Sequence, residues 1–177
     1  MVKEKINLGL ENFNHTIDGW ISELQSYNLG KLLMKPTPES WSLGQLYNHL
    51  IDQTKYYFEQ IEDCLNQNEN STENMKENAK FMFSKNSFPD ERIKGDPAFT
   101  EKVQQPASLP ELLEKMKQLK LEINRIGNKI LENSSTGKTR HPGLGYFNAR
   151  EWFQFAEMHL RHHWKQKERI DDFLKGH

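Results

Sequence analysis

Four stretches of this 177-residue chain carry apolar residues at intervals of three and four positions. An α-helix repeats every 3.6 residues, so this spacing gathers the apolar side chains on one face of each helix. The strict alternation of apolar and polar residues that is typical of half-buried β-strands is not found along the sequence. The spacing therefore predicts an all-α protein built from four amphipathic helices.

Glycines, prolines and capping residues set the bounds of these helices. The first is expected from about residue 3 to residue 27, and Gly30, Pro36 and Pro38 after it predict a loop. The other three begin at pairs typical of a capping box, in which two residues three positions apart each satisfy a backbone N–H of the other. These pairs are Ser42 with Gln45, Ser108 with Glu111, and Asn148 with Glu151. They predict helices that continue to about residues 66, 130 and 173, with a loop between the last two.

The longest connection, residues 67–106, lies between the second and third helices. Residues 71–86 are compatible with a short helix, while residues 87–106 hold three prolines and a glycine and predict an extended segment. About 40 residues exceed what an antiparallel pair needs, so we expect a crossover that leaves these two helices parallel. The predicted fold is a four-helix bundle with up-down-down-up topology in a single domain, residues 1–177. Two roles for residues 86–106 stay open, a cover over a cleft and part of a dimer contact.

Charge and cysteine content narrow the classes of partner. Lysine and arginine number 24 and aspartate and glutamate 25, which leaves a formal charge of -1. A chain so balanced has no broad basic surface, so we expect neither nucleic acid nor a membrane as partner and favour a small-molecule substrate or a protein. The single cysteine, Cys64, cannot form an internal disulfide, and neither a signal peptide nor a run of about 20 apolar residues is found. These features predict a soluble cytoplasmic protein.

The segment EMHLRHHWKQ, residues 157–166, holds three of the seven histidines. On a helical projection His159 and His163 each lie within about 20° of Trp152, which marks the core face, whereas His162 lies about 80° away. Four residues apart on one helix, two imidazoles lie side by side and can reach one metal ion. A pair of packed core histidines would show the same spacing, so a third ligand is needed to favour a metal site.

Four histidines remain as candidates for the third ligand. His15 lies off the apolar seam of its helix and is expected to be exposed, His141 is expected in a loop, and His177 is terminal. His49 deviates by about 120° from the apolar stripe of its helix, so periodicity alone leaves it partly exposed.

Two longer segments carry a family resemblance: PTPESWSLGQLYNHLID, residues 36–52, and HPGLGYFNAREWFQFAEMHLRHHWKQKERI, residues 141–170. They resemble the DinB/YfiT-like superfamily of bacterial four-helix proteins, in which a W-S stretch opens the second helix, one histidine follows about two turns inside it, and H-x-x-x-H lies on the last helix. The resemblance extends over essentially the whole chain in helix order and implies the up-down-down-up bundle and commonly a homodimer. It places the family's metal triad on His49, His159 and His163.

Three neutral imidazoles leave at least one coordination position open on a divalent ion, and zinc and nickel both suit imidazole. Such an ion lowers the pKa of a bound water or thiol. Members of the family include transferases and isomerases that use low-molecular-weight thiols, so the resemblance implies a metal-dependent enzyme, and our hypothesis is S-transfer of a bacillithiol-type thiol. Two alternatives stay open: a non-catalytic metal-binding protein of the stress or DNA-damage response, and a metal-dependent hydrolase. A fourth protein ligand or a sealed pocket would favour the structural role.

Overall fold

Helices make up most of the computed structural model, which describes residues 2–90 and 103–176, with side chains described from residue 8 onward. The elements in chain order are α1 (Val2–Leu24), α2 (Leu29–Leu33), α3 (Leu43–Asn66), α4 (Glu77–Lys85), α6 (Leu109–Glu132), β1 (Lys138–His141), β2 (Gly145–Asn148) and α7 (Ala149–Leu174). The prediction of a predominantly helical protein is confirmed. Within the described chain, every helix is too short or too polar to span a bilayer.

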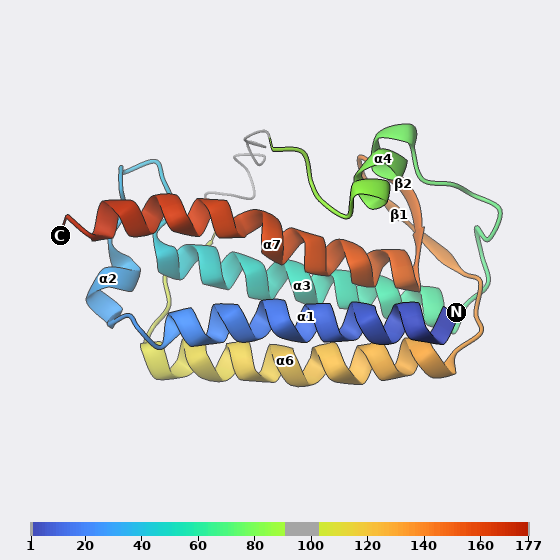
Figure 1. Ribbon diagram of the computed structural model, residues 1–177, viewed down its shortest axis with the longest axis horizontal. Helices are drawn as coiled ribbons and strands as arrows, with labels where there is room; N and C mark the ends of the chain where they lie inside the picture. Colours follow the sequence, from blue (N-terminus) through green and yellow to red (C-terminus); the bar gives the residue numbers. More distant parts are fainter. Residues whose placement is uncertain (1, 91–102, 177) are drawn as a thin grey trace.

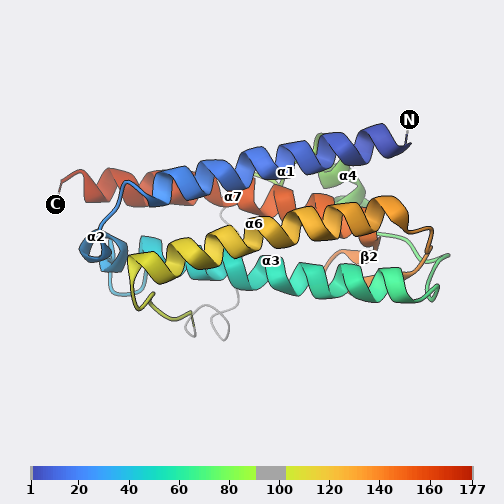
Figure 2. The ribbon, with the colours of Figure 1, turned by 90° about the horizontal axis from the view of Figure 1, so that it is seen from below.

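The four long helices, α1, α3, α6 and α7, lie alongside one another (Figure 1 and Figure 2). α1 packs against α6 and α7, and α3 packs against α7 and α6. In Figure 1 the chain runs from right to left along α1 and α7, and from left to right along α3 and α6. Their apolar faces meet in one core, in which Trp20 of α1, Tyr47 of α3 and Trp152 of α7 are fully buried.

The long helices begin at the capping residues that the sequence predicts. Complete capping boxes form at α3 and α7, from Ser42 with Gln45 and from Asn148 with Glu151. At α6 only half of the expected box forms. Ser108 accepts a hydrogen bond from the backbone N–H of Glu111, but the carboxylate of Glu111 lies 2.6 Å from the ammonium of Lys115. An ion pair one turn along the helix therefore replaces the return bond to the cap.

The loop predicted after the first helix is interrupted by the five-residue helix α2, which corrects that prediction. α1 ends at Leu24, earlier than the residue 27 expected. Asn28 caps α2, because its side-chain oxygen accepts a hydrogen bond of 2.9 Å from the backbone N–H of Lys31. Leu32 is fully buried and ties this short helix to the core. A helix of this length has too few apolar positions to show a period in the sequence.

A second correction concerns the residues between α6 and α7, where an antiparallel hairpin replaces the expected loop. β1 pairs with β2 so that Lys138 lies opposite Asn148 and His141 lies opposite Gly145. His141 therefore ends a strand, whereas the sequence placed it in a loop. Only two residues of β2, Gly145 and Phe147, are buried, so the alternation is too short to recognise in the sequence.

The first part of the long connection is attached to this hairpin. Met75 forms an isolated bridge with Gly145, and the backbone N–H of Lys76 donates to the carbonyl of Leu144 at 2.8 Å. α4 follows at once and lies within residues 71–86, where a short helix was expected.

The second part of the connection is described at its two ends, because residues 91–102 of the predicted extended segment lie outside the described residues. Beyond them, the chain lies against the start of α3. The side-chain amide of Gln45 donates to the carbonyl of Val103 at 2.7 Å, and that of Asn48 donates to the carbonyl of Gln104 at 2.8 Å. The connection thus returns to α3 at the residue next to His49.

Candidate metal centre

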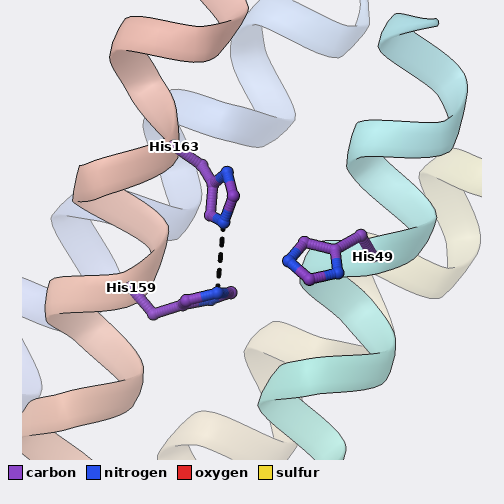
Figure 3. Close-up of side chains that lie close together, drawn as sticks. All are labelled: His49, His159 and His163. Atoms are coloured by element: carbon purple, nitrogen blue, oxygen red, sulfur yellow. Dashed lines mark hydrogen bonds between the residues drawn. The ribbon is translucent and has the colours of Figure 1, made fainter. Parts of the chain in front are cut away.

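Three histidines from two helices converge at one point (Figure 3). His49 extends from α3, and His159 and His163 extend from successive turns of α7. Each offers one ring nitrogen to a group in which all ligand atoms lie within 4.8 Å of one another. The ring centre of His49 lies 5.2 Å from that of His159 and 4.9 Å from that of His163. The structure therefore brings together the three residues that the family resemblance selected.

The helix geometry explains why these side chains meet. His159 and His163 are four residues apart, so both leave α7 on the side that packs against α3. His49 lies beside the apolar stripe of α3. Leu46 and Leu50, which belong to that stripe, are fully buried. Because α3 contacts both α6 and α7, its buried arc is wide and a residue at the edge of that arc still reaches α7. His49 is half-buried, as periodicity predicted.

The distance between the two histidines of α7 fits a shared ion. Their Nε2 atoms lie 3.1 Å apart. Two imidazole nitrogens bound tetrahedrally at about 2.05 Å from one zinc ion lie about 3.3 Å from each other. The Nδ1 atom of His159 is buried and has no hydrogen-bond partner, whereas Nδ1 of His163 lies 2.9 Å from Oε1 of Gln166. The donor set of three imidazoles suits zinc or nickel.

Burial lowers the pKa of all three histidines, because a charged imidazolium loses the water that would solvate it. The pKa of His49 falls from 6.5 to about 3, chiefly through burial, with a smaller effect of His163. Burial lowers the pKa of His163 to about 4. It also holds the pKa of His159 well below its usual value, with further lowering by His163, His49 and His162. The rings are therefore neutral near pH 7, which is the form that binds metal ions.

Aromatic rings surround the cluster. The ring of Tyr57 lies edge-on to His159 at 5.5 Å between centres, and the ring of Trp41 lies 4.7 Å from that of His49. Tyr57 is buried, and Trp41 is half-buried. The histidines therefore face an apolar wall on the side of the core, which accounts for much of the loss of solvation.

Residues 86–90 lie along α7 beside the cluster. The ring of Phe88 lies 6.2 Å from that of His159 and 5.2 Å from that of His162. Asp90 forms an ion pair with Lys165. One end of the long connection therefore lies beside the histidines of α7, and the other end lies beside His49 of α3.

The other histidines lie apart from the cluster. His15 is exposed on α1, as predicted, and the ring of His141 packs 5.6 Å from that of Trp152 and 5.1 Å from that of Phe155. His162 packs on Phe88 and is not part of the group of ligand atoms. His177 lies outside the described residues.

Sequence reasoning missed two neighbours of the cluster. Gln166 follows His163 by three residues on α7, a spacing that places two side chains on one helix face and would have identified it. Phe88 lies in a segment without periodicity, and the sequence offered no signal for its position.

The fold and the cluster define a class of protein, a helical chain in which imidazoles from two helices form a candidate metal centre. The sequence profile of the DinB superfamily matches residues 11–166, and the chain belongs to this superfamily. The match includes all three histidines and confirms the resemblance drawn from residues 36–52 and 141–170. A search of curated proteins found none that matches this chain.

Proposed function

We propose that His49, His159 and His163 bind a divalent metal ion, zinc or nickel, and that the protein uses this centre to transfer a low-molecular-weight thiol of the bacillithiol type to an electrophilic acceptor. The observation that carries the proposal is the convergence of three neutral imidazoles that leave room for an exogenous ligand.

The composition of the cluster favours chemistry over a purely structural role. Among the described residues, the group that could hold an ion consists of the three histidines, without a cysteine or carboxylate as fourth ligand. Structural zinc sites are usually closed by four protein ligands, whereas catalytic sites keep a position for water or substrate. Each of the three residues is half-buried, so none of them is fully enclosed in the core.

A divalent ion held by these histidines would act as a Lewis acid and would lower the pKa of a bound thiol or water toward neutrality. The chain's own residues hold and shield this position. Tyr57 and Phe88 pack against the ring of His159 and exclude water from that side. No carboxylate of the described residues belongs to the cluster, so we expect the thiol proton to leave to solvent rather than to a protein base.

The proposed reaction balances without a further reactant. The sulfur of the thiol forms a bond to the electrophilic carbon, and the bond from that carbon to its leaving group breaks. With a chlorinated nitroaromatic acceptor, the products are the thioether conjugate, a chloride ion and the released proton.

The up-down-down-up bundle is part of this proposal. The packing of α1 on α6 and α7, the packing of α3 on α6 and α7, and the chain directions in Figure 1 support it. In such a bundle the second and last helices are neighbours, which is what a site shared by His49 and the two histidines of α7 requires.

The test begins with protein purified without a histidine tag, because a tag binds nickel. Elemental analysis is expected to find about one divalent ion per chain. The loaded protein is then incubated with bacillithiol and a chlorinated nitroaromatic compound, and the conjugate is measured by mass spectrometry. His159→Ala is expected to lose the ion and the conjugate, while His15→Ala, which changes an exposed histidine of α1, retains both.

Two outcomes would contradict the proposal. Conjugate formation by His159→Ala at the rate of the unmodified protein would show that the cluster is not needed. Metal-dependent turnover of acyl or phosphoryl esters, without turnover of thiols, would assign the centre to hydrolysis.

A further inference from the structure

We infer that Gln166 is a positioning residue for the metal centre, which fixes the tautomer of His163 and directs its Nε2 lone pair to the ion. The inference rests on the proposed function, since it concerns how the same cluster is prepared for a ligand.

The contact between the two side chains determines where the ring hydrogen lies. Oε1 of Gln166 lies 2.9 Å from Nδ1 of His163. A carbonyl oxygen only accepts hydrogen bonds, so Nδ1 of His163 must donate. A neutral imidazole has one N–H, and the hydrogen on Nδ1 therefore leaves Nε2 with a free lone pair. That lone pair is directed at the cluster, where Nε2 of His159 lies 3.1 Å away.

The two histidines of α7 are consequently unequal. Because Nε2 of His163 accepts, the hydrogen between the rings lies on Nε2 of His159. Nδ1 of His159 then carries a lone pair, and it is buried without a partner. His163 can bind an ion through Nε2 at once, whereas His159 must first move its hydrogen from Nε2 to Nδ1.

This inequality makes Gln166 the outer partner on which the centre depends. Histidines that bind metals usually donate their second N–H to a carboxylate or carbonyl, which orients the ring and raises its basicity. Among the described residues, the Nδ1 atom of His159 has no such partner. The amide of Gln166 supplies one to His163 without adding charge.

Zinc affinity tests the inference through two substitutions and a matched control. Gln166→Leu keeps the size and helix propensity but removes the acceptor, while Gln166→Glu keeps an acceptor of similar reach. Gln118→Leu is the control, because Gln118 is an exposed glutamine of α6 whose amide binds Glu114 at 2.7 Å. The dissociation constant for zinc is measured by competition with a chromophoric chelator, and unfolding of the metal-free proteins is measured in parallel.

We expect Gln166→Leu to weaken zinc binding by about 10- to 100-fold, the usual effect of losing an outer partner. Gln166→Glu should stay within a few-fold of the unmodified protein, and Gln118→Leu should be unchanged. Equal zinc affinity in Gln166→Leu and the unmodified protein would overturn the inference, as would a loss in Gln118→Leu of the same size. If Gln166→Leu does not fold, Gln166→Asn, whose amide is one methylene too short, takes its place with the same expectation.

A second measurement separates this inference from the proposed function. The ring ¹⁵N chemical shifts of the metal-free protein report which nitrogen of His163 carries the hydrogen. We expect Nδ1–H in the unmodified protein and a mixture of tautomers in Gln166→Leu. If the unmodified protein binds no ion, the proposed function fails, and the tautomer still decides the role of Gln166. Nε2–H on His163, or the same tautomer in both proteins, would contradict it.

Discussion

His49 is the ligand that α3 contributes to the cluster, and its loss would leave two imidazoles from a single helix. We predict that His49→Ala weakens zinc binding by more than the roughly 10- to 100-fold that follows the loss of an outer partner. Chelator competition measures the effect, with His15→Ala as the control. Retention of full affinity by His49→Ala would mean that α7 alone holds the ion.

His141 supplies a prediction on pH dependence. Its ring packs against Phe147 and Trp152, and burial lowers its pKa from 6.5 to about 4. The unfolded chain therefore takes up a proton at a higher pH than the folded chain does. The stability contributed by neutral His141 is present in full above pH 6.5 and is lost as the pH falls from 6.5 toward 4.

We expect His141→Phe, which keeps an aromatic ring but does not titrate, to flatten the fall in stability over this range. Urea denaturation of the metal-free proteins at pH 7 and pH 5 measures the difference. The three histidines of the cluster are present in both proteins. The effect of His141 is therefore the difference between the two proteins in how much their free energy of unfolding changes from pH 7 to pH 5. Parallel responses would contradict the prediction.

The hairpin of β1 and β2 is attached to the long connection at a glycine that no other residue can replace without strain. Gly145 has a φ of +91°, and a Cβ atom there would lie 2.8 Å from the carbonyl oxygen of Asn74. We predict that Gly145→Ala destabilises the protein by about 2 kcal/mol. Gly9→Ala is the matched control, because nothing lies within 4 Å of its added Cβ and alanine favours a helix, so it should stabilise by up to about 1 kcal/mol. Denaturant titration compares the two variants, and a neutral Gly145→Ala would show that the backbone adjusts.

The same elements show what the sequence can and cannot predict. The long helices were predicted because their signals are local: the period of the apolar residues and caps such as Ser42 and Asn148. α2 and the hairpin were missed because five or four residues are too few to display a period. The cluster lies between these cases. The pair on α7 followed from helix geometry, but His49 lies off its apolar stripe and was identified through the family resemblance.

At the scale of the whole molecule, the cluster joins two helices, so ion binding should stabilise the folded chain. An ion that binds the folded state and not the unfolded state adds about 2.7 kcal/mol of stability at a concentration of 100 times its dissociation constant. For a chain of this length we expect a rise in Tm of about 5 to 10 °C. Differential scanning calorimetry with zinc, and then with excess chelator, measures the rise and its reversal. An equal rise in His49→Ala would place the bound zinc elsewhere.

The course of the long connection has a consequence for how such a protein can diverge. The connection contacts α7 through Phe88 and Asp90 before residue 91. It contacts α3 again through Gln104, whose carbonyl accepts a hydrogen bond from Asn48, the residue next to His49. Phe88 is half-buried against the core, whereas Asp90 and Gln104 are exposed. Substitutions at the two exposed positions can remodel what approaches the imidazoles while the helices and their caps stay intact, so a duplicated copy could acquire a new specificity at little risk to folding.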